Sequence, residues 1–202
     1  MRTINRSWLL GLALLAASGC GYNTIQTYDE QVNAAESQIK VQLQRRADLV
    51  PNLVETVKGY AKQEQTIFTE VAEARAKLAG AVQGGNLEQM AQANAALTAP
   101  LGRLLAIAEN YPQLKSNENF LRLQDELAGT ENRIAVERRR YNETVQDYNT
   151  YISLFPSSLI AGMAGFTRND AYFKTDEGSR RAPKVDFGTS PAPTPAPAPT
   201  RP

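Results

Sequence analysis

Apolar residues recur at helical spacing over most of this chain. In residues 25–78 they follow one another at steps of three or four, averaging about 3.5, the repeat at which helices supercoil around one another. Residues 87–110 and 116–155 continue the same pattern. No alternation typical of strands appears before residue 156. The pattern predicts an all-α fold, an elongated antiparallel helical bundle of three long helices with coiled-coil character, over residues 25–155.

Pro51 lies inside the first stretch. Proline lacks a backbone donor, and its ring clashes with the carbonyl of the residue four positions earlier, here Ala47. Because the apolar stripe keeps its phase across the proline, one long helix kinked near Pro51 is favoured. The alternative is a break at Asp48, which would cap a new helix and place Pro51 harmlessly in its first turn. The first helix would then count as two.

Glycines and cap residues mark the predicted helix ends. Gly80, Gly84 and Gly85 are expected to end the first helix. Asn86 is expected to cap the second helix, with Gln89 completing a capping box.

Prolines mark the remaining boundaries. Pro100 should kink the second helix, and residues 111–112 should stop it. Ser116 is expected to cap the third helix, and Pro156 to end it.

The C-terminal part is less regular. Residues 156–188 are expected to form an irregular segment packed on the bundle, in which 172–173 and 185–187 act as short extended anchors. The apolar, glycine-containing run 159–166 either packs closely on the bundle or contacts lipid. Residues 189–202 hold six of the eleven prolines, alternating largely with alanine, and predict a disordered, solvated tail.

The first twenty residues have the pattern of a signal peptide. Arg2 and Arg6 precede an apolar run at 8–17, which as a helix would span only ~15 Å, about half of a bilayer core. Small residues follow, and the single cysteine, Cys20, comes next. The string LAASGC at 15–20 resembles a bacterial lipobox, although Ala17 stands where leucine is usual. Cleavage between Gly19 and Cys20, lipidation of Cys20 and a short lipidated linker at 20–24 are therefore expected.

Two alternatives to the lipoprotein remain open. One is a short apolar anchor that is never cut. The other is an ordinary secretory signal with a chance cysteine. The residue after Cys20 is glycine rather than aspartate, which favours the outer membrane if the source is Gram-negative.

The amino-acid composition excludes several kinds of catalytic and metal-binding site. The chain of 202 residues has no histidine and one cysteine, so it has no histidine-based catalytic site, no intrachain disulfide and no cysteine-rich metal site. With 22 basic and 21 acidic residues, it also lacks the excess of positive charge that is typical of nucleic-acid-binding proteins. We therefore expect no catalytic residues, no metal and no cofactor.

Two long strings resemble the LemA family: IKVQLQRRADLVPNLVETVKGYA at 39–61, and the segment 114–155 that begins LKSNENFLRLQDELAG. The ending at 183–187, PKVDF, is also similar to the family's usual finish, so the resemblance covers about residues 22–188. It implies a bacterial, membrane-attached helical bundle with no established general activity and no catalytic residue to carry over. Family members usually begin with a transmembrane helix; this chain departs from that with its short apolar run and Cys20.

The family often has a histidine beside a glutamate after the Gly-Tyr-Ala stretch. Here the pair is Gln63 and Glu64, so a metal role through that histidine cannot apply.

Polar residues near Pro51 form the first candidate cluster. Arg45, Arg46 and Asp48 precede the proline, and Asn52 follows it. They would either satisfy backbone groups freed by the proline and pair with a neighbouring helix, or form a docking surface for a partner.

Glu131 and Arg138 lie on the apolar stripe of the third helix, where polar residues often fix the register of packed helices. Seven residues apart, they cannot pair along one helix, so each needs a partner across the bundle. Arg45 or Arg46 is the candidate for Glu131. Asn132, Asn142 and Asn149, with Tyr141 and Tyr148, are expected to form interhelical hydrogen bonds.

These observations favour a non-enzymatic, lipid-anchored envelope protein on the extracytoplasmic side of a membrane. It would act as a scaffold or interaction module for unidentified envelope proteins, and self-association stays open. The rival is a membrane-shaping protein that self-assembles and engages lipid through the run at 159–166. A hydrolase using carboxylates is less favoured, because no catalytic motif accompanies them.

Overall fold

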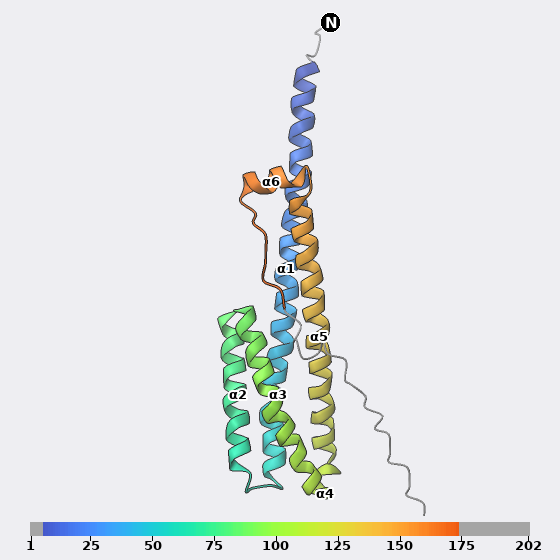
Figure 1. The fold of residues 1–202 in the computed structure, drawn as a ribbon. Helices are drawn as coiled ribbons and strands as arrows, with labels where there is room; N and C mark the ends of the chain where they lie inside the picture. Colours follow the sequence, from blue (N-terminus) through green and yellow to red (C-terminus); the bar gives the residue numbers. More distant parts are fainter. Residues whose placement is uncertain (1–5, 174–202) are drawn as a thin grey trace, which may run out of the picture.

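The structure, a computed structural model, describes residues 6–173, with side chains from residue 21 onward. This part of the chain is all-helical, without strands, as predicted. The helices, shown in Figure 1, are α1 (Arg6–Lys58), α2 (Gln65–Gly84), α3 (Leu87–Asn110), α4 (Pro112–Lys115), α5 (Glu118–Ser153) and α6 (Ser157–Ala164).

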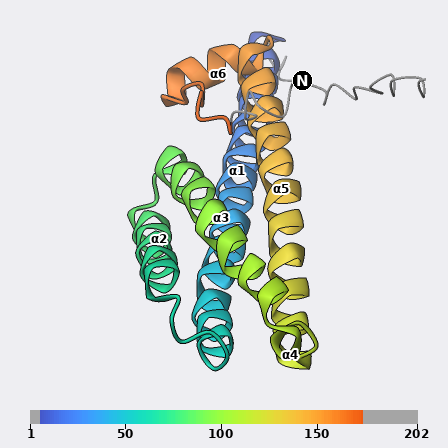
Figure 2. The same ribbon diagram turned by 60° about the horizontal axis from the view of Figure 1, so that its bottom comes forward.

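The long helices α1 and α5 form an antiparallel pair that runs the length of the molecule. The hairpin of α2 and α3 packs on the half of this pair that lies away from the N-terminus, where α3 crosses α1 obliquely (Figure 2). At the other end, α6 lies across the pair beside the point where α1 leaves the bundle (Figure 1). The core follows the predicted stripe and includes Ile39, Leu43, Ile134, Tyr141 and Val145.

The prediction of three long helices is wrong in one respect. The first apolar stretch folds into two helices, and the chain reverses at residues 59–64 rather than at Asp48 or Pro51. Gly59, a poor helix former, stands directly after α1. Ala61 in the turn and Phe68 in α2 both enter the core, so the stripe keeps its phase although the helix has ended. Lys58 lies over the Phe68 ring, 5.7 Å from its centre, and links the two helices.

The helix α1 continues through Pro51 without a break. The proline removes the usual donor to the carbonyl of Ala47, but the Nε of Arg75 in α2 donates to that oxygen over 3.2 Å. The polar residues near the proline were expected to take this part. Instead, a side chain from the next helix satisfies the freed carbonyl, and this fastens α2 to α1.

Two helix starts are fixed by asparagine caps. As predicted, the side chain of Asn86 accepts a hydrogen bond from the Gln89 amide at the start of α3 (2.9 Å). At the start of α5 the cap is Asn117, which accepts from the Phe120 amide over 3.1 Å. Ser116 was the expected cap, but its hydroxyl donates to the carbonyls of Pro112 and Gln113 instead.

Part of the segment that was expected to be irregular is helical. Residues 157–164 form α6, which the sequence did not predict because eight residues are too few to show a period. Residues 167–173, named here the strap, run back along α5 without forming a helix, and the Phe173 side chain is buried. Tyr172 and Phe173 therefore anchor the strap as predicted. The expected anchor at 185–187 and the tail at 189–202 lie outside the described residues.

In the part of the chain that the structure describes, no helix is both long enough and apolar enough to cross a membrane.

Two glycines at the end of α2 should respond oppositely to substitution. Gly85 caps α2 in the left-handed conformation with φ of 68°, so Gly85→Ala is expected to destabilise the protein by about 1 kcal/mol. Gly80 was expected to end the helix but lies inside it, and an added Cβ would meet nothing within 4 Å. Gly80→Ala should therefore stabilise by about 0.5–1 kcal/mol. Urea denaturation of both variants tests this pair, and equal signs would contradict it.

Candidate functional site

Arg46 lies at the centre of a polar network inside the bundle. Its side chain projects from the C-terminal half of α1 and is only 6% exposed. The guanidinium forms an ion pair with Glu131 of α5 and donates a hydrogen bond to the side-chain oxygen of Asn94 in α3 (2.8 Å). The network therefore joins the two long helices to the α2–α3 hairpin. Of the two arginines considered as partners of Glu131, Arg46 is the one that contacts it.

The electrostatics of Arg46 are those of a cation held out of water. Burial lowers the pKa of its guanidinium, because desolvation disfavours the charged form. Its Nε is buried without a hydrogen-bond partner in the described part of the chain. The side chain of Glu131, by contrast, is 48% exposed. The pair is thus asymmetric, with a buried cation and a carboxylate that reaches water.

A groove with a volume of about 790 Å³ lies next to this network, and both Asn94 and Glu131 line it. It lies between the start of α3, the middle of α5 and the strap. Both Glu131 and Arg138 line it, so the two charged residues on the predicted apolar stripe of α5 share one site. Its remaining lining includes Glu88, Gln92, Asn94, Thr98, Asp170 and Tyr172.

The strap forms one wall of the groove and is fastened by two asparagines two turns apart on α5. Asn142 pairs with the backbone of Phe173 in both directions, donating to its carbonyl and accepting from its amide, each over 2.9 Å. Asn149 does the same with Asn169, at 2.7 Å and 2.9 Å, and also donates to the Tyr172 hydroxyl. These side chains were expected to link helices, but they act as substitute backbone partners for the strap.

Aromatic side chains complete this attachment. The Tyr148 hydroxyl donates to the carbonyl of Thr167 over 3.0 Å, and burial raises the pKa of this hydroxyl above its ordinary value. The Phe173 ring packs edge-on against Tyr141, with 5.6 Å between centres. Arg138 lies over the Phe173 ring at 4.9 Å, so its charge also contributes to holding the strap.

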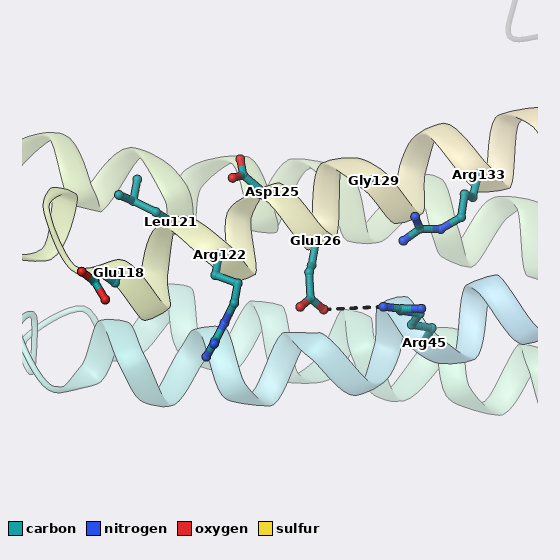
Figure 3. Close-up of a pocket in the computed structure, with 8 residues that line it drawn as sticks. All are labelled: Arg45, Glu118, Leu121, Arg122, Asp125, Glu126, Gly129 and Arg133. Atoms are coloured by element: carbon teal, nitrogen blue, oxygen red, sulfur yellow. Dashed lines mark ion pairs between the residues drawn. The ribbon is translucent and has the colours of Figure 1, made fainter.

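Arg45 and Asp48 do not join the buried network. Arg45 points to the outside of α1 and lies 3.8 Å from Glu126 of α5, an exposed pair visible in Figure 3. Asp48 accepts a hydrogen bond from Gln44 one turn earlier (2.8 Å). The depression around Arg45 carries equal numbers of basic and acidic side chains and is lined by Arg45, Glu118, Leu121, Arg122, Asp125, Glu126, Gly129 and Arg133.

Sequence reasoning missed Asn94 and Arg75. Asn94 lies in the apolar face of α3 and is buried, so a polar residue at a core position of that helix was a signal that could have found it. Arg75 is half-buried and follows the core residue Ala74 of α2, but nothing in its spacing indicates the Ala47 carbonyl as its partner.

The arrangement is that of a structural polar site. Glu131 pairs with Arg46, and Asp170 accepts from Arg168 over 2.9 Å. Among the described residues, no group of three or more histidine, cysteine, aspartate or glutamate side chains could hold a metal ion. The side chains of this polar site connect α1, α3, α5 and the strap.

Gly19 and Cys20 lie within the helical course of α1, but their side chains are outside those that the structure describes. Cleavage and lipidation there remain predictions.

Known proteins resemble this chain over most of its length. The chain is 30% identical over 186 residues to the magnetosome proteins MamQ 2 and MamQ 1 of Paramagnetospirillum magneticum, covering 81% of this chain and 68% of each relative. It is 28% identical over 180 residues to the magnetosome protein MamQ of Magnetospirillum gryphiswaldense, covering 78% of this chain and 66% of the relative. Residues 35–187 match the LemA family. This match includes α5, the strap and the C-terminal part of α1 (residues 35–58), and the chain therefore belongs to the LemA family.

Proposed function

We propose that this protein is a lipid-anchored envelope protein that works as a non-enzymatic scaffold on the extracytoplasmic side of a membrane. The observation that carries the proposal is the continuity of α1, which is one helix from Arg6 to Lys58. Cys20 therefore stands in direct line with the longest helix of the bundle. A lipid there would attach the bundle by one end.

The dimensions fit a spacer that holds an interaction surface away from a membrane. At about 1.5 Å per residue, Arg46 lies roughly 39 Å from Cys20 along α1, and Lys58 lies roughly 57 Å away. The α2–α3 hairpin packs on this distant half (Figure 1). The groove and the hairpin would thus face other envelope proteins, while the anchor stays at the opposite end.

Two further observations support a scaffold over an enzyme. The charged groups at the centre of the groove are engaged with one another or with the strap, as described above. The names of the MamQ relatives assign them to a cellular structure, the magnetosome, and not to a reaction.

The intact mass of the mature protein, isolated from membranes, tests the anchor. We expect a product that begins at Cys20 and carries added acyl mass, which holds it in the membrane through a high-salt wash. A Cys20→Ala variant should lose both the added mass and the cleavage before residue 20. An unmodified wild-type product that still carries the first residues would contradict the lipoprotein and indicate a retained anchor.

The second candidate, a membrane-shaping protein, is favoured by one observation, the exposed apolar side chains around α6. Electron microscopy of phospholipid vesicles carrying the acylated protein separates the two. A scaffold leaves the vesicles round, and a membrane-shaping protein draws them into tubules or buds.

A further inference from the structure

Among the described residues, the most exposed of the large apolar side chains lie at one end of the molecule. Phe155, at the corner between α5 and α6, is 81% exposed, and Met163 of α6 is 91% exposed. Leu159 lies one turn before Met163 on the same side of α6 and is 61% exposed. These three residues are named here the outer face of α6. The opposite side of the helix is buried against the bundle through Ser157 and Ala161.

This face lies at the level of the predicted anchor. Gly21, the residue after Cys20, packs so closely on α6 that an added Cβ would come within 2.5 Å of the Ile160 Cδ1 atom. The next residue, Tyr22, packs its ring against Phe166 just beyond α6, with 5.7 Å between centres. The position of α6 along α1 is therefore set by contacts immediately after Cys20.

We propose that the outer face of α6 inserts into the surface of the phospholipid bilayer in which Cys20 is anchored. This inference rests on the proposed function, because the anchor supplies the reference level. A glyceryl group bound to the Cys20 sulfur must lie at the interface between headgroups and acyl chains. A helix that touches Gly21 then lies at the same interface, and its exposed apolar side chains face lipid rather than water.

The composition of α6 suits an uncharged lipid surface. Residues 157–164, SSLIAGMA, carry no ionisable side chain. Insertion therefore depends on apolar burial, and neither anionic lipids nor low salt are required. Since α6 lies across α1 and α5 (Figure 1), its insertion gives the bundle a second attachment beside the lipid and holds the long helices upright on the membrane.

Site-specific fluorescence on the full acylated protein tests the insertion. Met163→Cys and, separately, Leu159→Cys are labelled with a polarity-sensitive nitrobenzoxadiazole probe and reconstituted into phosphatidylcholine vesicles. The matched control is Val136→Cys, an apolar position of α5 that is 56% exposed but lies far from α6 along that helix. Quenching is then compared between spin-labelled phosphatidylcholine in the bilayer and iodide in the water.

We expect lipid-borne quenching at residues 159 and 163 to exceed that at residue 136 by about threefold or more, with iodide giving the opposite order, unchanged by salt. Iodide quenching at 163 equal to that at 136 would overturn the inference. Protection from both quenchers would also overturn it and indicate a second copy of the chain on this face. Failure of the anchor is seen separately, because an unacylated Cys20 in the parent protein would itself take up the label.

Discussion

Replacing Glu131 by alanine is expected to lower the free energy of unfolding by about 3 kcal/mol. The change leaves the Arg46 guanidinium, 6% exposed, without a counter-charge in the middle of the bundle. The guanidinium would keep its hydrogen bond to the Asn94 side-chain oxygen. Its Nε has no hydrogen-bond partner among the described residues even before the change. An uncompensated buried cation costs several kcal/mol, and the water that reaches the Glu131 position places this case at the lower end of that range. Equilibrium urea denaturation measures the difference.

Replacing the other partner of this ion pair, Arg46, should lower the free energy of unfolding by less. In Arg46→Met the apolar stem of the side chain is kept and the buried charge is removed, while the half-exposed Glu131 carboxylate is hydrated by solvent. Only Asn94 loses a buried partner, so about 1–2 kcal/mol is expected. The control is Arg45→Ala, which breaks the exposed pair with Glu126 and should change stability by less than about 0.5 kcal/mol. If Glu131→Ala costs no more than Arg45→Ala, the network is not a stability element.

The apolar stripe was sufficient to predict the fold class, because a period near 3.5 over a hundred residues has no other structural explanation. It could not locate the reversal at residues 59–64. Ala61 and Phe68 both pack in the core, and the pattern records burial rather than the direction of the helix axis. The cap at Asn86 was predicted correctly because capping is local in sequence. The attachment of Arg75 to the Ala47 carbonyl was not, since that contact depends on how α2 folds back.

The same distinction explains the polar site. A charged residue on an apolar stripe needs a partner, so Glu131 and its arginine could be proposed from the sequence. The choice between Arg45 and Arg46, neighbours that point about 100° apart on a helix, depends on how α1 is rotated against α5. The anchors at residues 172–173 were predicted from the sequence, but the attachment of the strap by Asn142 and Asn149 was not, because these side chains bind its backbone and backbone groups carry no residue-specific signal.

Replacing Asn149 by alanine is expected to release the first part of the strap from α5. Asn149 is 3% exposed, and its amide makes three hydrogen bonds, two with the backbone of Asn169 and one with the Tyr172 hydroxyl. Losing them should lower the free energy of unfolding by about 2 kcal/mol, with the loss limited because a detached strap can bind water instead. Amide hydrogen exchange by NMR is the direct measurement, and exchange at Asn169 should accelerate about tenfold or more.

Asn132 was also expected to form a hydrogen bond across the bundle, but its side chain is exposed. As an asparagine on the same helix, it provides the matched control. Asn132→Ala should leave exchange at Asn169 unchanged and be neutral or slightly stabilising, since alanine is the better helix former. Unchanged exchange at Asn169 in the Asn149→Ala variant would show that its hydrogen bonds do not hold the strap.

A double substitution decides whether the strap detaches as one unit. Asn142 holds Phe173 at the far end, where the Tyr141 ring and Arg138 also contact it. If the two ends are independent, Asn149→Ala leaves the Phe173 amide protected, and the stability losses of the two single variants add. If the strap is one cooperative unit, either substitution exposes both amides, and the double variant loses little more than one single variant. The short length of the strap and its attachment at both ends favour the cooperative result, in which case the wall of the groove opens as a whole.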